Sequence, residues 1–372
     1  VSSIAAGRDH TCALKTDGSV LCWGSNYNGQ LGDGTFVDKL APNPVPSLGP
    51  GAALAISAGE LHTCVLKSDK SVFCWGDNNY GQVGDGTKEG RLVPAPVNGL
   101  GAGSVSFISS GPRNTCAVKT DGSLVCWGNV YMFVRNIGDR YRVTSPSLVP
   151  EFSAGTIGSV AVDHFQMCVV RIDGSAACAG WNHSGELGNG TTTLSTPSSD
   201  PVLVYGLGAG TTAAVSTGRE FSCGLKIDGS VVCWGWNAHS QLGDGTVTNR
   251  YAPTLVTGLT AGTITAITSG DSHSCAIKTD GSVVCWGYNG NGQLGDGTNI
   301  DERVPVPLVM SVAAPSTSNT WTNSSCASLV GSSDTVALLQ QQISDLQKLQ
   351  QTAEIIEKIN LLQKKINCIM AR

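Results

Sequence analysis

The sequence predicts an all-β protein, a β-propeller of about six four-stranded blades, with seven blades as the alternative. We expect the N- and C-terminal strands to close the propeller and a C-terminal α-helix to follow it. Three observations predict this fold. One unit of about 52 residues occurs six times along the chain. Each copy carries short runs of strand-forming residues separated by turn residues, as propeller blades do. Glycine contributes 47 of the 372 residues, about twice its usual share, which suits a chain with many tight turns.

Two cysteines with nine residues between them mark each copy. In the first copy they lie in the run TCALKTDGSVLCWG at 11–24, and the first cysteines of successive copies are 52, 52, 52, 55 and 52 residues apart. A second run, GQLGDGT or a close variant, follows in every copy except the third, which has NIGDR at 136–140. Two runs that recur together in this way define a repeat architecture.

Each copy is expected to hold four strands. In the second copy we place these strands near 44–48, 53–58, 62–67 and 71–75. The run SSIAAG at 2–7 matches the second type of strand, and VPVPLV at 304–309 matches the first type. We therefore expect the two ends of the repeat region to complete one blade together, which would remove an open sheet edge.

The spacing of the cysteines fits a β-hairpin. With Thr16, Asp17 and Gly18 as a three-residue loop, Cys12 faces Cys22 in a non-hydrogen-bonded pair, where Cα atoms lie ~4.5 Å apart. A helical hairpin is a poorer explanation, because D-G lies between the cysteines and Val, Leu and Trp lie beside them. A zinc site is also poorer, because no C-x2-C occurs. The predicted disulfides are Cys12–Cys22, Cys64–Cys74, Cys116–Cys126, Cys168–Cys178, Cys223–Cys233 and Cys275–Cys285.

At these residues the chain resembles the regulator of chromosome condensation repeat family, whose units carry ALKTDGSV-like, CWG-x-N and GQLGDGT-like runs. The resemblance covers about 1–310. It implies a propeller, usually of seven blades in this family, although the six units counted here favour six. Its best-known activity is nucleotide exchange on a small nuclear GTPase linked to chromatin, whereas other members are inhibitors, receptors or surface binding modules. Disulfide spacing, an acidic net charge and the lack of a basic tail set this chain apart from the exchange factor.

Charge and cysteine content narrow the expected partners and compartment. With 23 Lys and Arg against 28 Asp and Glu, the net charge is −5, so the chain lacks the basic surface that a nucleic-acid partner requires. No apolar stretch approaches the ~20 residues of a membrane span. Fourteen cysteines spaced to form pairs indicate an oxidising compartment, which predicts an extracellular or cell-surface protein.

The sequence offers no convincing catalytic, metal-binding or cofactor-binding group, so we expect neither an enzyme nor a cofactor. His10, His62 and His273 share one repeat position, which favours a packing role. The aspartates of the G-D-G-T runs lack the D-x-D-x-D-G spacing of a calcium loop, so we interpret these runs as turns, with an ion site as the weaker alternative.

Binding residues are sought where the repeats vary while their frame stays constant. One variable ring follows each C-W-G run, and a second ring of mixed charge precedes the first cysteine of each copy. Aromatic and arginine side chains are typical of binding hot spots, although a loop of the divergent third copy that simply packs differently remains an alternative. The candidates are Tyr27, Tyr80, Tyr131, Phe133, Arg135, Trp181, His183, Trp236, His239 and Tyr288.

The C-terminal part has a different composition. Residues 311–333 read as a Ser, Thr, Asn and Pro-rich linker, and 334–372 as an amphipathic helix for oligomerisation or anchoring, without a regular heptad. A continuous helix would place Cys368 ~51 Å from Asp334, whereas the eight residues back to Cys326 reach ~28 Å at most. We therefore expect Cys326 and Cys368 to bond between chains, unless the helix folds back.

Together these features predict a non-enzymatic extracellular structural or adhesive subunit. Its propeller would bind an unknown protein or glycan, and its helix would join it to other copies of itself, in a homo-oligomer or filament. A monomeric secreted binding module or inhibitor is the alternative, and a nucleotide exchange factor is the less favoured one.

Overall fold

The computed structural model describes residues 1–131, 142–152, 155–308 and 362, and the structural statements below concern these residues. The chain divides into two compact units, Val1–Leu308 and Val309–Arg372. The expected linker at 311–333 and helix at 334–372, apart from Leu362, lie outside the described residues. So do the cysteines expected to join chains, Cys326 and Cys368. No helix among the described residues is long and apolar enough to cross a membrane.

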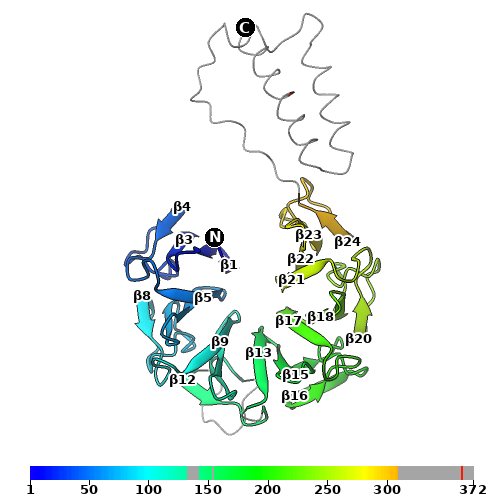
Figure 1. Cartoon of the computed structure of the whole chain (residues 1–372), viewed down its shortest axis with the longest axis horizontal. Helices are drawn as coiled ribbons and strands as arrows, with labels where there is room; N and C mark the ends of the chain where they lie inside the picture. The colour runs from blue at the N-terminus through cyan, green and yellow to red at the C-terminus, as the bar shows by residue number, and fades with distance from the viewer. Residues whose placement is uncertain (132–141, 153–154, 309–361, 363–372) are drawn as a thin grey trace, which may run out of the picture. The chain divides into compact units, whose positions relative to one another are not determined.

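The first unit consists of six antiparallel four-stranded sheets, each built from four consecutive strands (Figure 1). The first two blades are β1 (Ser3–Ala6), β2 (His10–Leu14), β3 (Val20–Gly24) and β4 (Lys39–Pro44), then β5 (Ala53–Ala58), β6 (His62–Lys67), β7 (Val72–Gly76) and β8 (Arg91–Pro96). The third and fourth are β9 (Val105–Ser110), β10 (Asn114–Lys119), β11 (Leu124–Gly128) and β12 (Val143–Leu148), then β13 (Ile157–Val162), β14 (Gln166–Arg171), β15 (Ala176–Asn182) and β16 (Thr193–Leu203). The last two are β17 (Thr212–Gly218), β18 (Phe221–Lys226), β19 (Val231–Gly235) and β20 (Arg250–Leu255), then β21 (Ile264–Ser269), β22 (His273–Lys278), β23 (Val283–Gly287) and β24 (Glu302–Pro307).

These sheets confirm the all-β propeller of six four-stranded blades. The prediction that the two ends of the repeat region share one blade is wrong. The strand β1 is the innermost strand of the first sheet, and β24 is the outermost strand of the sixth. The strand assignment within a repeat was also shifted: 45–48 is a turn, and the fourth strand of the second blade is β8, beyond the GQVGDGT loop.

The prolines of the fourth strand are consistent with its position at a sheet edge. The fourth strand carries proline in all six blades, for example Pro94 and Pro96 in β8, and Pro305 and Pro307 in β24. Proline has no N–H to donate, so within sheets it is confined to edges, where no neighbouring strand needs that hydrogen bond. The first and fourth strands are both sheet edges, so the prolines at 305 and 307 fit the outer edge on which β24 lies but do not distinguish it from the first-strand position that we predicted.

The hairpin between the second and third strands forms as predicted. Gly18 has φ 81°, its N–H donates to the Lys15 carbonyl, and the carboxylate of Asp17 accepts from the Ser19 N–H at 3.0 Å and from its hydroxyl at 2.6 Å. These hydrogen bonds hold the pKa of Asp17 well below its usual range. The hairpin register sets Cys12 opposite Cys22. All six predicted cysteine pairs are bonded, with Cα atoms 4.1 Å apart in each.

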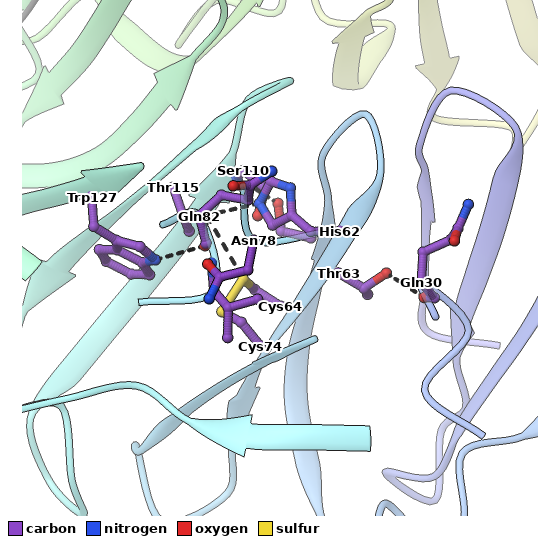
Figure 2. The surroundings of a disulfide bond; sticks show 12 residues. Gln30, His62, Thr63, Cys64, Cys74, Asn78, Gln82, Ser110, Thr115 and Trp127 are labelled. Atoms are coloured by element: carbon purple, nitrogen blue, oxygen red, sulfur yellow. Dashed lines mark hydrogen bonds between the residues drawn. A yellow bond between two sulfur atoms is a disulfide. The ribbon is translucent and has the colours of Figure 1, made fainter. Parts of the chain in front are cut away.

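Blades are joined by a repeated set of contacts that Figure 2 shows around Cys64–Cys74. The Trp127 Nε1–H and the Thr115 hydroxyl both donate to the carbonyl of Gln82 in the preceding blade, at 2.8 and 3.1 Å. His62 Nε2 lies 2.9 Å from the same Thr115 hydroxyl. The innermost strands of successive blades also pack together, from β1 against β5 to β17 against β21. Each boundary therefore combines an apolar core with a few buried hydrogen bonds.

Candidate binding surface

The two variable rings of the sequence lie together at one end of the strands. In every blade, the N–H of the residue after C-W-G (C-A-G in the fourth blade) donates to a carbonyl of the loop that precedes the second strand, for example Asp77 to Leu61 and Trp236 to Glu220, at 2.9 and 2.8 Å. These bonds recur because the two loops leave neighbouring antiparallel strands at the same end. We call the surface formed by these twelve loops the binding face.

A buried asparagine fixes the long loop of the binding face in five of the six blades, whereas Val130 holds its position in the third. In the second blade, Asn78 Oδ1 accepts from the Val83 N–H at 2.9 Å, and its Nδ2 donates to the carbonyls of Thr87 and Glu89 at 3.1 and 3.0 Å. Asn26, Asn182, Asn237 and Asn289 accept from the equivalent N–H groups. A single side chain thus satisfies several backbone groups that the loop would otherwise leave unpaired. The variable side chains are therefore displayed on an ordered frame.

The aspartates of the G-D-G-T runs belong to this frame. Asp85 accepts from the Thr87 N–H at 3.0 Å and from its hydroxyl at 2.8 Å, and it pairs with Arg91. Burial alone would raise the pKa of Asp85, but the hydrogen bonds from Thr87 and the pairing with Arg91 outweigh it and leave the pKa lowered. These carboxylates are occupied by donors of their own loops. Among the described residues, no three His, Cys, Asp or Glu side chains cluster as metal ligands would.

An aromatic cluster forms where the fifth and sixth blades meet. The His239 ring lies edge-on to both Trp236 and Tyr288, with centroids 5.3 and 4.9 Å apart. Its Nδ1 lies 3.1 Å from Oδ2 of Asp301, which orients the ring. On the fourth blade, Trp181 and His183 stack with centroids 4.3 Å apart. The structure therefore brings together Trp236, His239 and Tyr288, which are 52 residues apart at the extremes.

A charged cluster spans the first three blades of the same face. Glu60 accepts from Arg8 Nη1 at 2.9 Å and lies 3.5 Å from Nε of Arg113. Arg113 also donates to the Tyr80 hydroxyl at 3.1 Å, and its guanidinium lies 5.1 Å from the centre of that ring. Arg8 remains 61% exposed, so it can still meet a partner. One carboxylate thus positions two arginines and, through Arg113, a tyrosine.

The other candidates have different outcomes. Tyr27 is 53% exposed on the binding face of the first blade, and Tyr131 is partly buried at the edge of the described residues. Phe133 and Arg135 lie outside the described residues. Sequence reasoning missed Asp301, which accepts from the Asn289 N–H, although a polar residue at the same repeat position in other blades could have indicated it. Asp38 and Asn249 precede the outer strand in other blades and accept the same loop N–H.

The shared histidine position serves the blade boundaries. His10 and His62 are buried, and burial lowers the pKa of His10 to about 4 and that of His62 to about 3. In the fourth blade Gln166 takes this position and donates to the Ser222 hydroxyl at 3.1 Å. In the fifth blade the buried Phe221 takes it without any side-chain hydrogen bond, so the position accepts polar and apolar core side chains, which agrees with a packing role.

Comparison with known proteins gives a consistent result. Two family models for the regulator of chromosome condensation (RCC1) repeat match, one at residues 1–30, 54–82, 213–241 and 264–293, the other at 17–66, 69–118, 228–277 and 280–328. The chain is 28% identical over 306 residues to the ultraviolet-B receptor UVR8 of Arabidopsis thaliana, covering 82% of this chain and 69% of that protein. It is 30% identical over 224 residues to the human E3 ubiquitin-protein ligase HERC2, covering 60% of this chain but 5% of that protein.

Solved structures show the same fold. Prp20p from Saccharomyces cerevisiae, described with its binding to Gsp1p and histones, is similar with a TM-score of 0.73 at 20% identity, covering 84% of this chain and 77% of that one. Human WBSCR16 is similar with a TM-score of 0.70 at 25% identity, covering 83% and 81%.

Proposed function

Because the chain belongs to the regulator of chromosome condensation (RCC1) repeat family, we propose that its propeller is a non-enzymatic binding module that recognises a partner protein through the binding face. The relatives named above include a receptor and a ligase, so the fold alone does not choose an activity. What supports binding is the side chains that the frame displays. Aromatic and arginine groups gather on one ordered surface, and such groups dominate the energetics of protein interfaces.

The compartment proposed is extracellular or the cell surface. Six disulfides bond all twelve cysteines of the described residues. Disulfides of this number persist in oxidising surroundings and are rare in the cytosol and nucleus. This proposal therefore favours an extracellular protein partner over the nuclear partners of an exchange factor.

The charge of the binding face indicates which partner fits it. In the first three blades Arg8 and Arg113 both contact Glu60, which is 18% exposed, and Arg8 also lies 3.6 Å from the exposed carboxylate of Asp9, so Arg113 is the arginine that an exposed carboxylate leaves unmatched here. The opposite half presents Trp236 and Tyr288 beside Asp301. We expect the partner to place an acidic group against the arginines and an apolar side chain against the aromatic cluster.

The test is a binding screen of the full chain against extracellular proteins, followed by variants of the binding face. Trp236→Ala, Tyr288→Ala and Arg113→Ala should each weaken a genuine partner at least tenfold, as expected of hot-spot truncation. The matched control is Tyr205→Ala, which is 71% exposed in the loop after β16, at the opposite end of the strands. A partner that loses affinity with Tyr205→Ala and not with the other three variants would contradict the proposal.

Joining of several copies through the C-terminal segment is a further part of this proposal. It is supported by Cys326 and Cys368, which follow the stapled propeller in an amphipathic sequence. Mass measurement of the native chain should give a multimer that collapses to one chain on reduction. A monomer with fourteen oxidised cysteines would instead favour the monomeric binding module.

A further inference from the structure

Two N-x-S/T sequences lie in the long loop of the fourth blade, with their asparagines seven residues apart. They are N-H-S at 182–184 and N-G-T at 189–191. Asparagine in this pattern accepts N-linked glycans in secreted proteins, provided that it lies at the surface. A third such sequence begins at Asn323, which lies outside the described residues. The surroundings of the two loop asparagines are very different.

Asn182 cannot take a glycan in the folded protein. It is 1% exposed, and its Nδ2 donates to the Thr191 carbonyl at 3.0 Å. Its Oδ1 accepts from the Leu187 N–H at 3.1 Å, as the asparagines at this position do in other blades. A sugar on Nδ2 would disrupt the hydrogen bond to Thr191 and would need space inside a closely packed loop. The fold therefore closes this acceptor sequence.

Asn189 holds its amide in the opposite way. Its Oδ1 accepts from the Thr191 N–H at 3.1 Å and from the Thr191 hydroxyl at 2.8 Å. Its Nδ2 meets no acceptor among the described residues, and the side chain is partly exposed. An asparagine that carries a glycan keeps its carbonyl oxygen and gives up only one of its two N–H groups. A glycan on Asn189 therefore leaves both hydrogen bonds from Thr191 in place.

The repeat explains why the Asn189 nitrogen has no partner. In the first, second and fifth blades an aspartate takes this position, and its second carboxylate oxygen meets a basic side chain of the outer strand. These pairs are Asp33 with Lys39 at 3.1 Å, Asp85 with Arg91, and Asp244 with Arg250 at 2.6 Å. The fourth blade has no Lys or Arg between 172 and 218. The amide nitrogen thus stands where other blades place a paired oxygen, with no basic side chain to cover it.

The residues that follow Asn189 leave room for a glycan. Gly190 is exposed, and apart from its chain neighbours no atom of the described residues lies within 4 Å of the place that a Cβ on it would take. The threonines at 191–193 are exposed as well. The Gly190 N–H donates to the Tyr251 carbonyl of the fifth blade at 2.8 Å, so the exposed turn is also anchored. Sugars on Asn189 can therefore extend into solvent without displacing the propeller.

We infer that Asn189 is the acceptor of an N-linked glycan when the chain is exported, and that Asn182 is not. This inference rests on the extracellular compartment proposed above. The donor is an oligosaccharide joined to a lipid through a diphosphate, and an oligosaccharyltransferase carries out the transfer. The Asn189 Nδ2 forms a bond to the anomeric carbon of the first sugar while the bond from that carbon to the diphosphate breaks. The lipid diphosphate leaves with the electron pair, Nδ2 loses one proton, and no atom is oxidised or reduced.

The measurement is glycopeptide mass spectrometry of the full chain, secreted by a cell that performs N-glycosylation. Cleavage after Glu186 places the two loop asparagines on separate peptides. The peptide with Asn189 should carry an oligosaccharide in the secreted protein, because its Nδ2 is accessible. The peptide with Asn182 should carry none, because a chain modified there cannot form the fourth blade.

Two variants provide matched controls. Asn189→Asp restores the side chain that other blades use in the same turn, where Asp85 accepts from the Thr87 N–H and hydroxyl. This variant should be secreted as well as the wild type and should lose one oligosaccharide from its intact mass. Ser184→Ala removes the acceptor pattern at 182–184 and leaves the Asn182 side chain in place. The carbohydrate mass of this second variant should equal that of the wild type.

Three results would overturn the inference. An unmodified Asn189 in secreted protein with all six hairpin disulfides formed would reject the glycan and leave the proposed compartment standing. A chain retained in the cell with reduced cysteines would reject the compartment and the glycan together. An oligosaccharide on Asn182 of the secreted, folded protein would show that burial does not decide between the two asparagines.

Discussion

His62 Nε2 lies 2.9 Å from the hydroxyl of Thr115, across the boundary between the second and third blades. The same hydroxyl donates to the Gln82 carbonyl at 3.1 Å, so one threonine links two segments of the preceding blade. His10 and Thr63 repeat the relationship at 2.9 Å one blade earlier. The boundaries on either side of the second blade thus depend on neutral, buried histidines.

Acid should weaken these boundaries. The folded pKa of His62, about 3, lies below the ordinary value near 6.5, so the unfolded chain binds a proton that the folded chain excludes. The histidine's contribution is therefore fully present above pH 6.5 and is lost as the pH falls toward 3. At pH 5 the loss amounts to about 2 kcal/mol for one such group. Urea unfolding of the wild type between pH 7 and pH 5 measures it.

The variant His62→Gln should flatten this pH dependence, because Gln166 serves the same position in the fourth blade without titrating. His62→Ala is the matched control: it should lower stability at pH 7 by removing the contact to Thr115, and because it also lacks the titrating ring it should show the same flattened slope as His62→Gln. A His62→Gln protein with an unchanged slope between pH 7 and pH 5 would argue against the buried neutral histidine.

Glu186→Gln should stabilise the protein at pH 7. Burial raises the pKa of Glu186, so its ionised form disfavours the folded state above the unfolded pKa. Its Oε1 has no hydrogen-bond partner among the described residues, and Gln30 and Gln241 at the same repeat position likewise leave Nε2 unpaired there, so an amide should remove the charge without losing a hydrogen bond. We expect a gain of about 1 kcal/mol. Thermal unfolding should show the gain shrinking as the pH falls toward 4, and a gain independent of pH would mean that charge is not its cause.

Trp75→Phe and Trp23→Phe form a matched pair. The Trp75 Nε1–H donates to the Gln30 carbonyl at 2.8 Å inside the core, so its loss should cost about 1 kcal/mol or more. Trp23 makes no such bond with the described residues, and the same substitution there should change stability by less than about 0.5 kcal/mol. Equal losses in urea unfolding would show that Trp23 is engaged as the other tryptophans are.

Removing one bridge should destabilise the protein modestly. The bond Cys64–Cys74 closes a short hairpin that also has a well-formed turn and both neighbouring blades in place. Cys64→Ala with Cys74→Ala should lower the free energy of unfolding by at most about 3 kcal/mol, since the closed loop is short. Loss of the whole fold at 25 °C would mean that the bridges are required for folding rather than for added stability.

Much of the fold was predictable because its information is local. The hairpin register follows from a three-residue loop whose Gly18 adopts a positive φ, and this register alone brings Cys12 to Cys22. The order of strands within a blade was less accessible. A repeated sequence has no marked beginning, so the same runs can be divided into blades at several points. The prolines of β24 were a partial signal, since they exclude the second and third strands of a blade but fit both of its edge strands.

The binding candidates illustrate the same division. Variation within a constant frame identified Trp236, His239 and Tyr288, but not that His239 would lie between the other two, nor that Asp301 would orient it. The link between Tyr80 and Glu60 likewise passes through Arg113, which belongs to the next blade. Such contacts cross blade boundaries and depend on how neighbouring sheets are rotated against one another.

The sequence by itself determined the repeat, the hairpin and its six cysteine pairs, because each arises from residues within about a dozen positions of one another. Only the tertiary structure decided that β1 is the innermost strand of the first blade and β24 the outermost strand of the sixth, and that two variable rings form one surface. The physical reason is that stacking of whole blades sums contacts between residues some 50 positions apart, and no local pattern encodes which of these contacts the end blades leave unmade.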